Sequence, residues 1–266
     1  MKKILKYFSL ITVSLVLVSC EIDNYDGPDA QLEGRIIVKG TGDPNFDGKN
    51  LQTTQGGGNM TIRMIETSWT KSESVTARDI NVMQDGTYRN LKLFSGSYKI
   101  YPYNGPFYPY TEDEYKDVQL VKGNTSLDME VMPYLNVEWV EEPHVIEQPV
   151  PDSNPVVIGK YITAKAKFKV NRKTVNGNVI TPSVSYGRMY IGTSIYPTNT
   201  AVGDYSQDIA YSNTDENQVI TFISRRHMLY DNITLYVRVG FRCRVDAPNG
   251  ITDKFNYTSV IQVKVP

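Results

Sequence analysis

Aromatic side chains gather in one short stretch of the chain, between Tyr98 and Tyr115. Such rings can stack on the apolar C–H faces of sugars, and the prolines between them stiffen the backbone and lower the entropy lost on binding. The candidate ligand-binding side chains are therefore Tyr101, Tyr103, Phe107, Tyr108 and Tyr110. The alternative is that these rings pack between domains or cap a core, because tyrosine suits half-wet positions. We expect a mixed outcome, with Phe107 mainly buried and Tyr108 and Tyr110 at least partly exposed.

Histidine and cysteine offer little for catalysis. The chain has two histidines, His144 and His227, and neither stands at metal-ligand spacing from the other or from a cysteine. The sequence contains no serine elbow, zinc-protease helix, phosphate-binding loop or dinucleotide fingerprint. We therefore expect no zinc site and no cofactor.

Two acidic pairs remain as catalytic candidates, Glu112/Glu114 and Glu141/Glu142. Glycoside hydrolysis uses two carboxylates roughly 5–10 Å apart, a separation that the sequence does not reveal. Acidic pairs are far commoner in solvated surface loops than in active sites. We therefore expect no enzymatic activity.

The segment Asp43 to Gly48 matches the first half of a calcium-loop pattern. The twelfth position of that pattern is Thr54, where a bidentate glutamate is needed, and no helical pattern flanks the segment. Asp, Asn and Gly also form turns without a metal. The pattern favours turns within a long loop from Lys39 to Asn59, and it leaves calcium binding in the 43–54 loop open.

Cys20 is the residue best placed for covalent chemistry. It follows an apolar run, Leu10 to Val18, which itself follows three lysines, so residues 1–19 predict a secretory signal peptide. The run is short for a membrane span, which needs about 20 residues. A cysteine directly after Val18-Ser19 resembles a bacterial lipoprotein signal, which implies cleavage before Cys20 and lipid attachment to its sulfur. An ordinary signal peptide or a single span with an incidental cysteine is the alternative.

The polar segment 20–30 is predicted to be an acidic, solvated tether. Its start, from Glu21 to Asp26, resembles the export signal of Bacteroidetes lipoproteins that are displayed on the outer cell surface. The resemblance implies a lipid-anchored protein of the outer membrane that faces the cell exterior.

The net charge gives no support to one class of partner, and the number of cysteines limits disulfide formation. Loss of residues 1–19 removes three lysines and changes the formal net charge from −1 to −4. That mild acidity gives no support to nucleic-acid binding. Once Cys20 is lipidated only Cys243 remains, so no intrachain disulfide can form, and a buried thiol is expected there.

Strands must position these residues, because no stretch after the signal peptide predicts a long amphipathic helix. In the first half, alternation predicts strands over 31–38 and 60–66. Asp85-Gly86 and Ser95-Gly96 predict turns that bracket a short strand, with Gly96 at positive φ and a further strand from Tyr98. A last strand is expected over 126–131.

The second half also predicts β-structure. Its expected strands are 136–140, 156–170, 184–195, 218–224, 233–245 and 255–265. Asn176-Gly177 and Asn249-Gly250 predict hairpin turns. The acidic, proline-rich segment Glu141 to Pro155 predicts a long surface loop. The expected fold class is all-β.

Together these pieces resemble a known family. The turn and strand elements resemble those of transthyretin-like or carboxypeptidase-regulatory-like domains, and the whole resembles the DUF3823 family of Bacteroidetes surface lipoproteins. The segments that carry the resemblance include Leu32-Glu33-Gly34, Asp85-Gly86-Thr87-Tyr88, Gly96-Ser97-Tyr98, Asn104-Gly105-Pro106-Phe107 and Val131-Met132-Pro133-Tyr134. The resemblance implies two tandem β-sandwich domains, transthyretin-like over 31–133 and immunoglobulin- or fibronectin III-like over 134–266. Because the segment 104–107 recurs in the family pattern, a structural role for it is favoured.

Members of this family often accompany an outer-membrane glycan importer and its binding lipoprotein. The resemblance therefore implies a non-catalytic accessory in glycan capture or uptake, which binds polysaccharide or the importer complex and reaches the membrane through the lipid on Cys20. Two alternatives stay open. One is a structural or adhesive surface protein, such as a pilus-associated protein, and the other is a glycan-degrading enzyme with an unrecognised site.

Overall fold

The computed structural model describes residues 27–54, 60–69, 77–175, 177–197, 205, 208–247 and 250–266. The expected signal peptide, Cys20 and most of the tether lie outside these residues, as do Asn176 and Asn249 of the expected turns. The described part is all-β apart from two short 3-10 turns, η1 (Glu112–Glu114) and η2 (Asn213–Asp215), so the expected fold class is confirmed. No helix in this part of the chain is long and apolar enough to cross a membrane.

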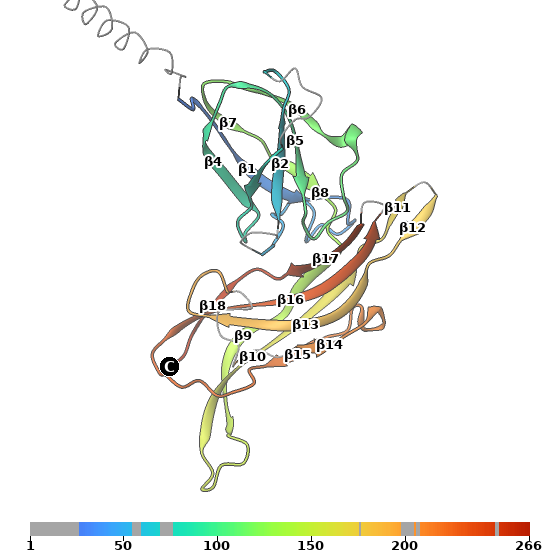
Figure 1. Cartoon of the computed structure of the whole chain (residues 1–266). Helices are drawn as coiled ribbons and strands as arrows, with labels where there is room; N and C mark the ends of the chain where they lie inside the picture. The colour runs from blue at the N-terminus through green and yellow to red at the C-terminus, as the bar shows by residue number, and fades with distance from the viewer. Residues whose placement is uncertain are drawn as a thin grey trace, which may run out of the picture.

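Figure 1 shows the strands gathered into two units, one above the other. The N-terminal unit contains two sheets. One has the order β4-β1-β7, with β8 also paired to β1, and the other has the order β3-β2-β5-β6. Its strands are β1 (Ala30–Val38), β2 (Thr61–Glu66), β3 (Arg78–Asn81), β4 (Thr87–Leu93), β5 (Gly96–Tyr103), β6 (Lys116–Leu120), β7 (Gly123–Ser126) and β8 (Met129–Val131).

Alternation of side chains places the core of this unit. Leu32 and Ile36 of β1 are fully buried, as are Ile62 of β2 and Ile100 of β5, and all four belong to one hydrophobic cluster. Residues at successive positions of a strand point to opposite faces of the sheet, so the apolar positions of each strand meet in the space between the sheets. The alternation of apolar residues in the sequence therefore identifies side chains that form the core of this unit.

The two expected glycine turns differ in their backbone. Gly86 has φ +78°, in the left-handed region where glycine is favoured. Gly96 does not have a positive φ, so the expected reason for glycine at this position is wrong. A Cβ at Gly96 would lie 2.8 Å from Ser68 Oγ. Gly96 therefore provides space for a neighbouring side chain at the start of β5.

The C-terminal unit contains a three-stranded sheet, β15-β10-β9, and a sheet of order β14-β13-β16-β17 in which β18 also pairs with β16. A separate hairpin joins β11 to β12, and β16 pairs with β17 up to Ala247↔Gly250, as the Asn-Gly dipeptides predict. The strands are β9 (Leu135–Pro149), β10 (Ile158–Val170), β11 (Lys173–Val175), β12 (Asn178–Ile180), β13 (Ser183–Gly192), β14 (Ile209–Ala210), β15 (Ile220–Ile223), β16 (Thr234–Ala247), β17 (Gly250–Tyr257) and β18 (Ile261–Lys264).

One expectation for this unit is wrong. Most of the segment predicted as a surface loop, Glu141 to Pro149, continues β9 and pairs with β10 up to Pro149↔Ile158. Among the described strands β9 has β10 as its one ladder partner, so it is an edge strand. An edge strand accepts proline because its outward N–H groups have no ladder partner. Figure 1 shows the resulting β9–β10 hairpin extending away from the N-terminal unit.

The two units have separate hydrophobic clusters. One cluster is drawn from residues 30–131, and the other from Tyr108 and residues 134–265. Cys243 is fully buried in the second cluster, as expected for a structural thiol. Tyr108 is the exception to the division by sequence, because it lies in the first half of the chain and packs in the core of the second. The predicted domain boundary and the transthyretin-like and immunoglobulin-like topologies stay predictions.

Candidate functional site

The two units meet along a seam, and the aromatic stretch supplies part of it. Phe107 forms a β-bridge with Pro133, which lies in the connection between β8 and β9. The backbone N–H of Tyr108 donates to Met132 O at 3.0 Å. These contacts hold the chain at the point where it passes from one unit to the other.

Strand β17 holds the opposite side of the seam. The Asn256 side chain accepts a hydrogen bond from Leu135 N at 3.1 Å and donates to Pro106 O at 3.0 Å. The next residue, Tyr257, accepts from Thr54 Oγ1 at 2.8 Å. Because Thr54 and Pro106 belong to the N-terminal unit, these bonds cross between the units and fix their relative placement.

Among the residues that the structure describes, Arg238 of β16 is the largest fully buried side chain, and it also lies in the seam. Its Nε donates to Pro197 O at 3.0 Å, and its Nη1 donates across the seam to Thr53 O at 2.7 Å. Its Cζ lies 3.8 Å from the ring centroid of Tyr257, a cation–π contact. Burial lowers the pKa of Arg238, and within the described part of the chain its Nη2 has no hydrogen-bond partner.

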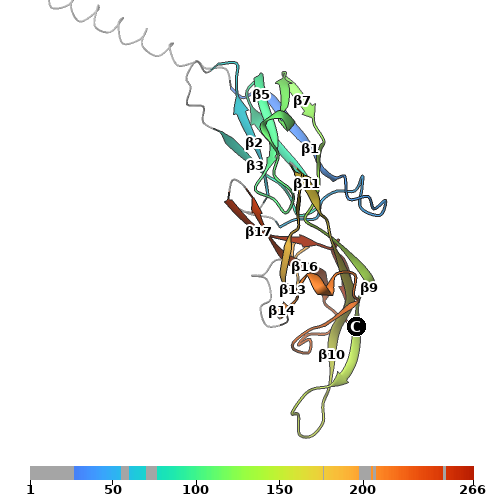
Figure 2. The ribbon, with the colours of Figure 1, turned by 90° about the vertical axis from the view of Figure 1, so that its right-hand side faces the viewer.

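A cleft of about 360 Å³ opens beside the seam. One wall is the segment between β1 and β2, and the other is formed by the start of β9 and the end of β17. Figure 2 shows the first of these segments, in blue, close to the start of β9. The lining residues are Val38, Asn45, Phe46, Lys49, Asn50, Leu51, Gln52, Pro133, Leu135, Val137, Glu138, Trp139, Asn256, Tyr257, Thr258 and Ser259.

Two partly exposed aromatic residues stand on opposite walls of this cleft, Phe46 and Trp139. The indole of Trp139 is held in place because its Nε1 donates to Ser259 O at 3.0 Å. Around the rings stand side-chain amides of Asn45 and Asn50, which make no side-chain hydrogen bond to any described residue. Apolar faces with amides beside them form a surface that can hold a ligand with both apolar and hydroxyl groups. The sequence-based search for site residues missed both rings.

The five residues selected from the sequence do not line this cleft. Tyr101 and Tyr103 of β5 lie on the outer face of the N-terminal unit. Tyr101 is 8% exposed and stacks on Tyr115, with ring centroids 3.7 Å apart, and burial raises the pKa of Tyr101 to about 12. Tyr103 is 38% exposed, and Arg63 Cζ lies 3.5 Å from its ring centroid. The arginine is held in turn by a bidentate ion pair with Asp79.

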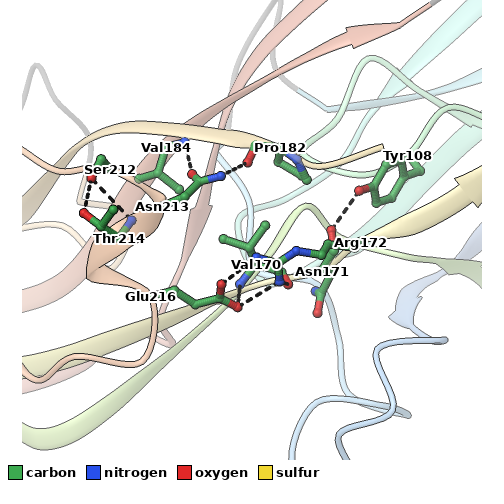
Figure 3. A network of polar contacts seen from close by, with 10 residues as sticks. All are labelled: Tyr108, Val170, Asn171, Arg172, Pro182, Val184, Ser212, Asn213, Thr214 and Glu216. Carbon is green, nitrogen blue, oxygen red and sulfur yellow. Dashed lines mark hydrogen bonds and ion pairs between the residues drawn. The ribbon is translucent and has the colours of Figure 1, made fainter. Parts of the chain in front are cut away.

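The other three candidates are mostly packed against protein. Phe107 is 2% exposed, so its expected burial is confirmed, and Tyr110 is partly exposed as expected. The expected exposure of Tyr108 is wrong, because it is 4% exposed and its hydroxyl donates to Asn171 O at 2.7 Å (Figure 3). Burial raises the pKa of Tyr108 and that of Tyr110 to about 12. The hydroxyl of Tyr110 donates to Glu130 O.

Figure 3 shows the surroundings of the Tyr108 contact in the C-terminal unit. Arg172, next to Asn171, forms an ion pair with Glu216 at 2.8 Å, and Glu216 also accepts from Val170 N at 3.0 Å. These bonds hold the connection between β10 and β11, against which Tyr108 packs. The aromatic stretch therefore serves the join between units at this position.

One carboxylate of each acidic pair, that of Glu114 and that of Glu141, is engaged in a structural contact. Glu114 accepts from the backbone N–H and hydroxyl of Thr111 at 2.7 and 2.9 Å and caps η1, which Glu112 begins. Glu141 lies 2.5 Å from Lys165 Nζ, and the hydrogen bond from this lysine lowers the pKa of Glu141. A general acid of a glycosidase needs a raised pKa instead.

The histidines also lie apart from one another. His144 Nδ1 lies 3.1 Å from Glu142 O, and His227 packs edge-on against Tyr161 with centroids 6.2 Å apart. No group of three or more His, Cys, Asp or Glu side chains that could hold a metal ion occurs among the described residues.

The 43–54 loop is built from turns. Asp43 Oδ1 accepts from Asn45 N at 2.9 Å, and Asp47 Oδ1 accepts from the backbone and hydroxyl of Thr41 at 3.1 and 2.9 Å. Such Asx and related turns are the metal-free use of these residue types. They shape the wall that presents Phe46 to the cleft.

Residues 30–132 match the family model described as the N-terminal domain of a protein of unknown function, DUF3823. The N-terminal unit of this chain therefore resembles the DUF3823 N-terminal domain. This match confirms the resemblance stated from the sequence. No curated protein matches the chain.

Solved structures resemble this chain over almost its full length. A DUF3823 family protein from Bacteroides uniformis is 23% identical with a TM-score of 0.67, and one from Parabacteroides merdae is 20% identical with a TM-score of 0.59. A proposed carbohydrate binding protein from Bacteroides uniformis is 19% identical with a TM-score of 0.62. Each match covers 90% of this chain and 100% of the other. At these identities the likeness shows a common fold.

Proposed function

We propose that this protein binds glycans in the cleft and acts as a non-catalytic accessory to glycan capture or uptake at the cell surface. The observation that carries the proposal is the pair of partly exposed rings, Phe46 and Trp139, on facing walls of a cleft of about 360 Å³. This volume lies within the range of small-ligand sites, roughly 300–1,000 Å³. Sugars need both apolar stacking surfaces and hydrogen-bonding groups, and the cleft offers the two together.

The walls of the cleft are held in place before any ligand arrives. Trp139 is fixed by its bond to Ser259, and the opposite wall is fixed by the bond from Arg238 to Thr53. A site that is ordered in the free protein loses less entropy on binding. The fixed positions of Trp139 and of the opposite wall therefore support ligand binding as the function of the cleft.

The charges of the cleft favour binding over hydrolysis. Glu138 is the one carboxylate among its lining residues, and it forms an ion pair with Lys167 at 2.9 Å. Glycoside hydrolysis by the usual routes uses two carboxylates that flank the scissile bond. The fold shared with a proposed carbohydrate binding protein also supports the proposal.

The proposed test of glycan binding replaces one ring at a time. Trp139→Ala and Phe46→Ala should each weaken the binding of oligosaccharides about tenfold or more, because an aromatic covered by a ligand contributes about 1.5–3 kcal/mol from buried area. Affinities would be measured by isothermal titration calorimetry with sugars selected on a glycan array. Trp69→Ala is the matched control, since Trp69 is 57% exposed on the N-terminal unit and does not line the cleft.

A different result would relocate the site. If Tyr103→Ala abolished binding while the two cleft variants bound normally, the site would be the outer face of β5. If no glycan bound the wild-type protein, the proposal would be wrong. Circular dichroism on each variant separates lost binding from lost folding.

We also propose that the protein is anchored in the outer membrane by lipid on Cys20, faces the exterior and operates beside a glycan importer complex. Cys20→Ser should leave the protein unlipidated, because the thioether is the membrane attachment that the sequence predicts. Detergent partition and mass spectrometry of the mature protein provide the measurement. An acylated Cys20→Ser protein would contradict the anchor.

A further inference from the structure

We propose that the cleft selects anionic glycans, in which a hexuronate carboxylate or a sulfate ester meets the ammonium group of Lys49. This inference rests on the proposed glycan binding and adds the class of ligand. It depends on the charges in and behind the walls of the cleft.

Lys49 is well placed to meet a ligand. Its backbone is fixed, since its N–H donates to Phe46 O at 3.0 Å and its carbonyl accepts from Val38 N at 2.8 Å. Its side chain is exposed at the cleft and forms no ion pair with any residue that the structure describes. The ring of Phe46 and the charge of Lys49 therefore stand in the same short segment of one wall.

Three carboxylates of the cleft and of the loop that carries Lys49 are already engaged. Glu138 is paired with Lys167 at 2.9 Å on the other wall. Asp43 and Asp47 belong to the same loop as Lys49, but their carboxylates accept hydrogen bonds within the loop and do not line the cleft. Of the two charged side chains that line the cleft, Lys49 is therefore the one whose charge an anionic ligand could neutralise.

A second positive charge lies behind the cleft. The guanidinium of Arg238 stacks at 3.8 Å on Tyr257, which lines the cleft, and no carboxylate among the described residues pairs with it. Salt and water screen a buried charge much less than an exposed one. Arg238 therefore adds a positive potential on the side of Tyr257, and it favours an anion in the cleft.

Neutral donors complete the site. The side-chain amides of Asn45 and Asn50 stand beside Lys49 among the lining residues and can each donate two hydrogen bonds. Carboxylate and sulfate oxygens accept such bonds, and hydrogen bonds to ionised groups are roughly twice as strong as neutral ones. An anionic sugar would therefore use this wall better than a neutral sugar of the same size.

The test compares ligands that differ in charge alone. The soluble mature chain is titrated with oligogalacturonate and with the same oligosaccharide as its methyl ester, and then with a sulfated oligosaccharide and its desulfated form. We expect each anionic ligand to bind more tightly than its neutral partner, and added NaCl to reduce the difference. The carboxylate and sulfate pairs tell which anion is the ligand.

Variants at one position connect the preference to Lys49. Lys49→Gln should weaken binding of the anionic sugars roughly tenfold, the factor expected when a charge-assisted hydrogen bond is lost, and should leave the neutral partners unchanged. Lys49→Arg should keep the preference. The matched control is Lys116→Gln, because Lys116 is an exposed lysine of β6 that does not line the cleft.

The outcomes separate the two proposals. Equal affinity for charged and neutral partners, or equal effects of Lys49→Gln and Lys116→Gln, would overturn the anionic preference and leave glycan binding intact. Absence of any sugar binding would overturn both. An anionic preference that survives Lys49→Gln would also overturn the role assigned to Lys49.

Discussion

Replacing Arg238 by alanine should lower the free energy of unfolding by about 3 kcal/mol and loosen the two units from each other. The substitution empties the volume of a fully buried side chain and leaves the carbonyls of Thr53 and Pro197 without their donors. Both losses occur in the seam, so the N- and C-terminal units should each keep their cores. Chemical denaturation measures the stability, and small-angle scattering measures the added flexibility.

The sign of this prediction depends on two opposing effects. A buried guanidinium without a carboxylate partner is costly to desolvate, and removing such a charge can stabilise a protein. We expect the cavity and the unsatisfied carbonyls to outweigh that gain, because the substitution removes two hydrogen bonds and a fully buried side chain together. An Arg238→Ala protein as stable as the wild type would show that the desolvation cost prevails. The control is Arg89→Ala, whose exposed ion pair with Glu33 should contribute about 0.5 kcal/mol or less.

The sequence predicts the strands well because alternation has one dominant cause. In β1, and in β10 from Ile162 to Val170, the buried positions recur at every second residue, so the apolar period of two is visible without any knowledge of the partner strands. The error at β9 has a different origin. Its prolines and acids suggest a loop, yet β9 is an edge strand, and the edge position of a strand is a property of the whole sheet.

The cleft is harder to predict, because docking of the two units creates it. Phe46 lies in a loop and Trp139 lies in a strand far along the chain, and no spacing in the sequence relates them. The aromatic stretch from Tyr98 to Tyr115 predicts a ligand-binding surface. Phe107 instead contacts the seam, and Tyr108 packs in the neighbouring core. Arg238 points to the face of β16 opposite the core residues Val237 and Val239, a face that usually meets solvent. It is buried because Tyr257 and Pro197 of its own unit and Thr53 of the other unit contact it there.

Replacing Gly34 by alanine should destabilise the N-terminal unit by about 3 kcal/mol, at the upper end of the range for overpacked cores. β1 pairs with β7 before Gly34 and with β8 after it, and Leu127 crosses over Gly34 between those two strands. A Cβ at Gly34 would lie 1.9 Å from the carbonyl oxygen of Leu127 and 2.9 Å from the hydroxyl of Tyr88. That hydroxyl donates to the same carbonyl, so the added methyl group must displace a hydrogen-bonded crossing of the backbone.

Thermal unfolding followed by circular dichroism measures this effect. For a chain of this size about 3 kcal/mol corresponds to a fall in Tm of roughly 6–12 °C. Gly27→Ala is the matched control, because a Cβ at Gly27 meets no atom within 4 Å. Its Tm should equal that of the wild type. If the Gly34→Ala protein had the same Tm as the control, the backbone at Leu127 could shift at little cost. The close approach of Leu127 would then not explain why β1 has glycine at this position.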